Sequence, residues 1–206
     1  MSPSGAPLQR AAELAPEEQV RANFYALLAR LFYAPPDQNL LAALAAADEI
    51  VAEGEDSPLA LAWRRLTLAA AGLEDAAVRH EYDSVFVGTG KAPVSPYAGA
   101  YLRQSAMENP LVVLRNFLAA HGLARHESVH EPEDHVAALS DVMRHLIAEQ
   151  HRDFDLQREF FMRFLWPAAP GFCAAAIAAE RTDFYRAVAR FAECFFALEH
   201  AAFDMQ

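Results

Sequence analysis

The spacing of apolar residues is the feature that most constrains the fold of this chain. Apolar side chains recur on a single helical face between Glu17 and Tyr33 and again between Asp183 and His200. The second face consists of Phe184, Val188, Phe191, Phe195 and Leu198. No run of alternating apolar and polar residues is long enough to support a sheet, and alanine, the strongest helix former, occurs 44 times. The sequence therefore predicts an all-α protein: a single helical domain of about nine or ten helices.

Prolines, glycines and capping residues set the expected helix boundaries. The predicted helices cover residues 17–33, 37–52, 57–72, 74–86, 110–121, 132–150, 154–165, 170–179 and 183–200. Residues 1–16 are expected to form a flexible tail ahead of the helical domain at 17–206. The polar, aperiodic stretch 121–130 is predicted to be a hinge between two halves.

Charge and hydropathy exclude several classes of protein. The chain has 28 acidic and 17 basic residues, a net charge of −11, which disfavours binding to nucleic acid or anionic lipid and favours a basic partner. The longest charge-free stretch, residues 164–179, is shorter than the roughly 20 residues of a membrane span, so no stable membrane insertion is predicted. The N-terminus lacks the apolar segment of a secretory signal, which predicts a cytoplasmic protein. Cys173 and Cys194 are expected to be buried thiols.

Motifs for catalysis or metal binding are weak. The Gly-Thr-Gly-Lys run ending at Lys91 lacks the other residues of a nucleotide-binding loop. Glu131, Asp134 and His135 are spaced to share one side of a helical turn, as metal ligands do, but Pro132 and the acids also fit the ordinary start of a helix. The sequence therefore predicts neither an enzyme nor a bound metal or cofactor. Two alternatives stay open: a metal- or nucleotide-dependent hydrolase that uses Asp134 and His135, and a permanent structural subunit of an oxidoreductase complex.

Three motifs together resemble a known family. They are Glu81-Tyr82-x-x-Val85-Phe86-x-Gly88-x-Gly90, Pro96-Tyr97-x-x-x-Tyr101 and Glu131-Pro132-x-Asp134-His135. In this combination and order they resemble the TorD/DmsD/NarJ family of chaperones for molybdenum-enzyme maturation.

This resemblance implies an all-helical cytoplasmic chaperone without a cofactor of its own. Such a protein would bind the N-terminal, twin-arginine type signal peptide of a molybdopterin oxidoreductase. It would hold the apo form of that enzyme for cofactor insertion before export or assembly, as a monomer or a domain-swapped dimer. The residues expected to bind the peptide are Tyr82, Phe86, Gly88, Pro96, Tyr97, Tyr101, Glu131, Pro132, Asp134 and His135. The resemblance does not distinguish between the TorD, DmsD and NarJ types, and so it does not identify the client enzyme.

Overall fold

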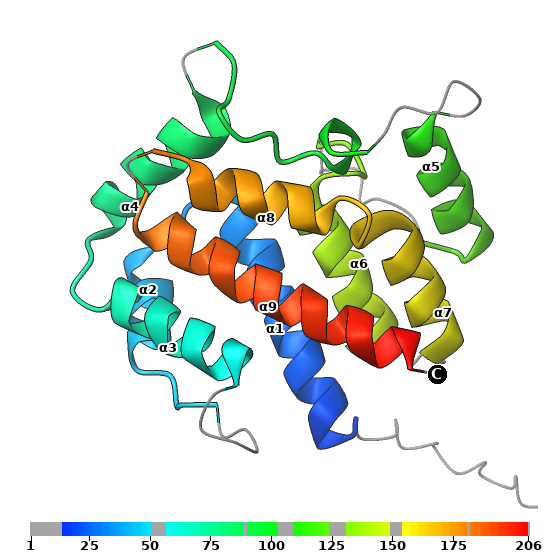
Figure 1. Cartoon of the computed structure of the whole chain (residues 1–206), viewed down its shortest axis with the longest axis horizontal. Helices are drawn as coiled ribbons and strands as arrows, with labels where there is room; N and C mark the ends of the chain where they lie inside the picture. The colour runs from blue at the N-terminus through cyan, green and yellow to red at the C-terminus, as the bar shows by residue number, and fades with distance from the viewer. Residues whose placement is uncertain are drawn as a thin grey trace, which may run out of the picture.

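The computed structural model describes residues 14–50, 57–88, 90–102, 109–123, 131–148, 154–180 and 182–205. These residues form nine α-helices and three short helical segments, and the only β pairing among them is one isolated bridge (Figure 1). This confirms the all-α prediction. Most of the predicted tail (residues 1–13) and most of the predicted hinge (residues 124–130) lie outside the described residues.

The helices largely follow the predicted boundaries. They are α1 (Pro16–Tyr33), α2 (Gln38–Ala45), α3 (Pro58–Ala70), α4 (Asp75–Tyr82), α5 (Pro110–Ala120), α6 (Val136–Ala148), α7 (Phe154–Phe160), α8 (Ala169–Ala178) and α9 (Phe184–Asp204). The π-helical turns η1 (Asp83–Val87) and η3 (Phe161–Leu165) continue α4 and α7, and η2 (Ala98–Ala100) is a single 3₁₀ turn.

One predicted helix is too long. α2 ends at Ala45 and not near residue 52, because the chain turns at Ala46 and then runs along α3. The indole Nε1 of Trp63 donates a hydrogen bond of 2.9 Å to the carbonyl oxygen of Asp48 in this segment.

The core lies around α1 and α9, which overlap at the centre of Figure 1. α6 packs along α1, and α3 and α8 pack along α9. Phe24 of α1 packs edge to face on Phe191 of α9, with ring centroids 5.1 Å apart. The predicted apolar face of α9 is buried up to Phe195, but Leu198 is 54% exposed and Phe203 is buried instead. A straight helix has 3.6 residues per turn, so its buried face drifts away from a strict heptad spacing.

A buried polar group ties α1 to α7 and α9. The Arg21 guanidinium donates two hydrogen bonds of 2.8 Å to the Glu199 carboxylate and one of 3.0 Å to Gln157 Oε1. The Tyr25 hydroxyl donates a further bond of 2.9 Å to Glu199. α1 is therefore fixed in position by directional bonds as well as by apolar packing.

The two cysteines differ in burial. Cys173 is fully buried as predicted, whereas Cys194 on α9 is only partly buried.

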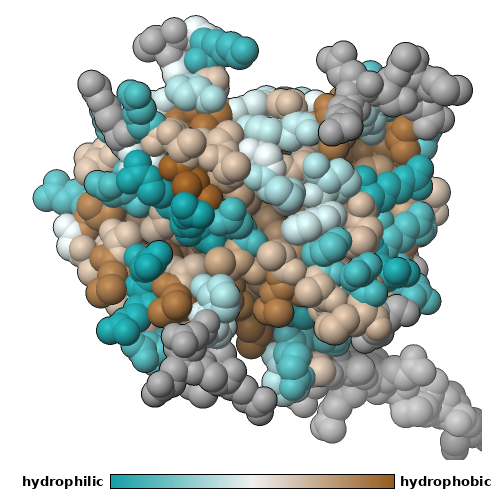
Figure 2. All heavy atoms as spheres, in the orientation of Figure 1, coloured by the Kyte–Doolittle hydropathy of each residue, from teal (hydrophilic) through white to brown (hydrophobic). Residues whose placement is uncertain are grey.

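Figure 2 shows hydrophilic side chains over much of the face that carries α3, α8 and α9, with the apolar ones in small groups between them. Within the described residues no single helix is long and apolar enough to cross a membrane; only the segment α7–η3 taken together with α8, bent by 51°, reaches that length and composition.

Candidate functional site

A groove of about 890 Å³ is lined by residues of α1, α6, the end of α5 and the Glu131–His135 turn. We call it the α1–α6 groove. Small side chains line much of it: Ala26 and Ala29 from α1, and Ala137 and Ala138 from α6. Because these side chains are small, α1 and α6 pack closely together, and the groove follows the surface that the two helices share.

Charged side chains line the groove together with the alanines. They are Arg30, Glu131, Glu133, Asp141, Arg144 and His145. Arg144 pairs with Asp141 at 2.6 Å, and Arg115 of α5 pairs with Glu133 at 2.9 Å. One side chain of each pair, Arg115 or Asp141, is more than half exposed, whereas the Glu133 and Arg144 side chains are only 15% and 28% exposed. Arg115 is therefore an exposed cation beside a carboxylate that is mostly buried.

The Glu131–His135 turn differs from its predicted structure. α6 begins at Val136 and not at Pro132, so Glu131, Asp134 and His135 precede the helix and do not share a helical turn. The reason is competition from another segment: the Val136 N–H donates to the Pro96 carbonyl at 2.8 Å, and Asp134 accepts from the Ala98 N–H at 2.8 Å. These bonds form the isolated bridge between Tyr97 and His135 and draw the turn away from the helix axis.

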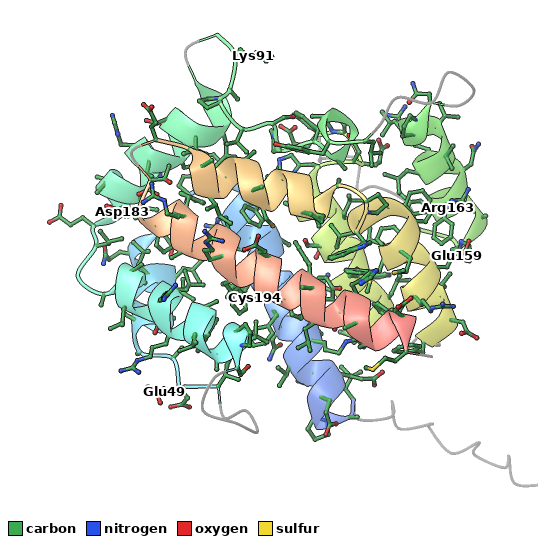
Figure 3. The ribbon with its side chains drawn as sticks, in the orientation of Figure 1. Glu49, Lys91, Glu159, Arg163, Asp183 and Cys194 are labelled. Carbon is green, nitrogen blue, oxygen red and sulfur yellow. The ribbon has the colours of Figure 1, made fainter. Side chains whose placement is uncertain are left out.

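The side chains of this turn point to different places. Glu131 and His135 face the α1–α6 groove, and Asp134 faces a second pocket of about 280 Å³. This pocket is lined by Ala98, Gly99, Leu102, Pro110, Val113, Leu114, Asp134, Leu139, Arg163 and Phe164. The Asp134 carboxylate accepts a hydrogen bond of 3.2 Å from the Gly99 N–H. Arg163 is drawn in Figure 3 beside Glu159, with which it pairs at 3.5 Å.

His135 is the most buried polar residue of the turn, at 4% exposure. Burial lowers the pKa of its imidazole, against the opposing effect of the Glu131 and Asp134 charges. Its Nδ1 accepts a hydrogen bond of 3.1 Å from the Ala137 N–H, and the Tyr97 ring packs edge to face on the imidazole at 5.4 Å. The imidazole therefore also helps to cap α6.

Tyr97 connects the second motif to the third. Its hydroxyl donates a hydrogen bond of 2.6 Å to Glu131 Oε2. That bond, with burial and the Glu131 charge, raises the pKa of Tyr97 to about 12. Of the ten residues expected to bind peptide, Glu131 and His135 line the groove directly, and Tyr97 contacts both of them.

Tyr82 and Phe86 lie in the core. The Tyr82 hydroxyl donates to the carbonyl of Tyr33 at 2.8 Å and also lies 3.2 Å from that of Phe32, both at the C-terminal end of α1. Burial, followed by the Glu131 charge, raises the pKa of Tyr82 to about 12. Phe86 is 6% exposed and packs on Tyr185 of α9 at 5.2 Å. These two residues hold one wall of the groove in place from behind.

The remaining motif residues shape the backbone nearby. Gly88 ends η1 with a φ of +65°, and a Cβ there would lie 2.8 Å from the Lys91 carbonyl oxygen, so the position requires glycine. The Tyr101 hydroxyl donates to the Ser95 carbonyl at 2.8 Å, and its ring lies against Gly171 at the start of α8. Pro132 precedes α6 and, through its carbonyl, accepts the His135 N–H at 3.2 Å.

Several groove residues were not singled out from the sequence. Tyr33, at 52% exposure, places its ring 6.3 Å from the His135 ring, and Arg30 lies one turn before it on α1. Asp141 lies on the second turn of α6, after the Glu131–His135 turn. The signal that could have found Tyr33 is an exposed aromatic at the end of an otherwise buried helix face.

The metal alternative gains no support from the arrangement of side chains. Among the described residues no group of three or more His, Cys, Asp or Glu side chains is placed to hold a metal ion. Glu131 and Asp134, two of the three suggested ligands, face different pockets.

Comparison with known proteins identifies the family. The sequence model of the nitrate reductase delta subunit family matches residues 52–174, more than half of the chain. The chain belongs to this family. Family membership confirms the resemblance to the TorD/DmsD/NarJ proteins and covers all three motifs.

Two of the curated relatives that match in sequence are chaperones. The Tat proofreading chaperone DmsD of Haemophilus influenzae is 28% identical over 115 residues, which cover 54% of this chain and 55% of the relative. The chaperone protein TorD of Vibrio cholerae is 26% identical over 125 residues, which cover 56% and 57%. The chain thus matches little more than half the length of these relatives.

One solved structure shares the fold over nearly its whole length. It is a redox enzyme maturation protein from Archaeoglobus fulgidus, with a TM-score of 0.55, 17% identity, and coverage of 92% of this chain and 99% of that one. This match confirms the fold.

Proposed function

We propose that this protein is a redox-enzyme maturation chaperone, and not an enzyme, that acts in the cytoplasm. It binds the N-terminal, twin-arginine type signal peptide of a molybdopterin oxidoreductase and holds the apo enzyme while its cofactor is inserted. The family and the chaperones named among its relatives support this role. The observation that carries the proposal is the α1–α6 groove, with its alanine lining and its carboxylates.

The apolar stretch of a signal peptide fits the groove between the alanines. A helical or extended apolar segment gains affinity by placing its bulky side chains in a groove between two helices. Ala26 and Ala29 of α1 and Ala138 of α6 are small and partly exposed, so leucine or phenylalanine side chains of the peptide can pack on them without displacing core residues.

The basic end of the signal fits the Glu131 end of the groove. Glu131 and Glu133 both line that end, and the protein as a whole carries a net charge of −11. Because the Arg115 side chain is half exposed, the arginines of a signal peptide can take its place beside Glu133. Such contacts increase the association rate and set the orientation of the peptide more than they increase its affinity, which suits a client that must dissociate later.

Isothermal titration with a synthetic peptide that carries a twin-arginine motif followed by an apolar stretch tests the proposal. Ala138→Phe fills the groove and should weaken binding at least tenfold, about 1.4 kcal/mol. Ala77→Phe, at an exposed alanine of α4, is the matched control and should bind like the unchanged protein. Equal binding by both variants would place the peptide outside the groove, and no binding by the unchanged protein would overturn the proposed function.

A second variant separates the two pockets. Asp134→Asn removes a charge from the smaller pocket while leaving the α1–α6 groove unchanged. If the signal arginines lie only beside Glu131 and Glu133, this variant binds normally. A selective loss of binding with an unchanged melting temperature would move the arginine site to Asp134.

A further inference from the structure

A second surface, away from the groove, combines exposed leucines with arginines. On α3, Leu61 and Leu68 are 45% and 65% exposed. Arg65 lies four residues after the first and three before the second, so the three share one helical face. On the adjoining helix α9, Leu198 is 54% exposed. We call Leu61, Arg64, Arg65, Leu68, Arg190 and Leu198 the α3–α9 patch.

The α3 side of the patch is basic, whereas on α9 Arg190 pairs with Glu193 at 3.0 Å. α3 contains no acidic residue, and Arg65 forms no hydrogen bond or ion pair with the part of the chain that the structure describes. Arg64 has only a 4.0 Å contact with Glu49, and both side chains are largely exposed. Glu49 is drawn at the edge of the molecule in Figure 3, well apart from Cys194 on α9.

Arg190, Cys194 and Leu198 are spaced four residues apart and share one face of α9. Burial raises the pKa of the Cys194 thiol, Glu193 raises it further, and the charges of Arg190 and Arg65 lower it. Figure 2 shows brown side chains among teal ones on this face, the mixture that such a patch presents to solvent.

Neither feature is explained by folding. A leucine that is two-thirds exposed contributes little to the core, and an arginine without a partner contributes no ion pair. Arginine beside exposed apolar side chains is, however, the composition enriched where proteins bind one another.

We propose that the α3–α9 patch binds an acidic amphipathic helix of a partner protein. Its apolar side chains pack on Leu61 and Leu68, and its carboxylates pair with Arg65 and Arg64. This interface goes beyond the proposed function, because the α1–α6 groove is suited to a basic segment and this patch to an acidic one. We favour a helix over an anionic membrane because a helix is small enough to contact the patch alone. An extended anionic membrane would also be repelled by the rest of the protein, whose net charge is −11.

The test uses a fluorescein-labelled synthetic helix of about 15 residues, long enough to be helical in part. It carries leucines spaced i, i+4 and i+7 with glutamates beside them, and a second probe replaces each glutamate by lysine. Fluorescence anisotropy should show that the glutamate probe binds the full chain. Arg65→Glu should weaken that binding about tenfold or more, and Leu68→Ser should weaken it as well.

Arg79→Glu is the matched control, since it makes the same change of charge at an exposed arginine of α4. It should alter the affinity less than about twofold, and Arg65→Glu should leave binding of the twin-arginine signal peptide unchanged. The proposal is overturned if the unchanged protein does not bind the glutamate probe, or if Arg65→Glu and Arg79→Glu weaken it equally. Binding to anionic lipid vesicles that is lost in Arg65→Glu, without binding of the probe, would also overturn it and identify a membrane surface.

Discussion

The buried bonds between Arg21 and Glu199 fix the position of α1, so removing Arg21 should destabilise the wall of the α1–α6 groove. The Glu199 side chain is 4% exposed and that of Arg21 20% exposed. Arg21→Met keeps most of the side-chain volume but leaves the buried carboxylate with only the Tyr25 hydroxyl as a partner. Stranding one member of a buried pair costs about 3–5 kcal/mol. For a chain of this length, that corresponds to a melting temperature lower by about 6–20 °C.

The double variant distinguishes a stranded charge from lost packing. In Arg21→Met with Glu199→Gln the buried group is neutral, and its amide oxygen still accepts from Tyr25. The double variant should therefore recover at least about 2 kcal/mol of the loss, measured by urea unfolding and thermal melts monitored by circular dichroism. A loss below about 1 kcal/mol in Arg21→Met, as for a surface ion pair, would refute the reasoning. So would a double variant less stable than the single one.

Three further predictions concern the same framework. Because burial raises the pKa of Tyr82 from 10.0 to about 12, the contribution of its neutral hydroxyl to the free energy of unfolding is complete below pH 10 and is lost as the pH rises towards 12. Chemical unfolding across that range should show falling stability, with a shallower fall in Tyr82→Phe. Because burial lowers the pKa of His135 below 6.5, the contribution of its neutral imidazole to the free energy of unfolding is complete above pH 6.5 and is lost as the pH falls. In chemical unfolding, His135→Gln should reduce this loss of stability in acid, and His80→Gln, at an exposed site, should not. Glu81→Ala should cost about 1 kcal/mol in thermal melts by removing a helix cap, whereas Glu74→Ala, whose side chain caps nothing, should cost less than about 0.5 kcal/mol.

The helices were predictable because their signals are local. The face from Glu17 to Tyr33 became α1, and Asn109 and Pro110 begin α5 where capping residues predict it. Local signals failed where a distant segment competes for the same backbone groups. Pro132 fits the first position of a helix, but bonds from residues 96–98 delay the start of α6 to Val136.

The cap of α9 shows the same limit. Asp183, where the predicted helix begins, directly precedes α9, but its side chain forms no capping bond and is fully exposed. Glu81 of α4 accepts the Tyr185 N–H at 2.7 Å and the Phe184 N–H at 3.3 Å instead. No single sequence shows that a carboxylate about 100 residues away lies at this helix end.

The three motifs contribute to the candidate site mainly by holding its walls. Tyr82 bonds the C-terminal end of α1, Glu81 caps α9 against which α1 packs, and Pro96 bonds the first N–H of α6. Both helices that line the groove are thus fixed at one end by a motif residue. Apart from Glu131, Glu133 and His135, the side chains that line the groove, such as Ala138 and Asp141, come from positions outside the motifs. Under the proposed function, the groove can therefore be adapted to a different client by changing its lining residues while the motifs keep α1 and α6 in place.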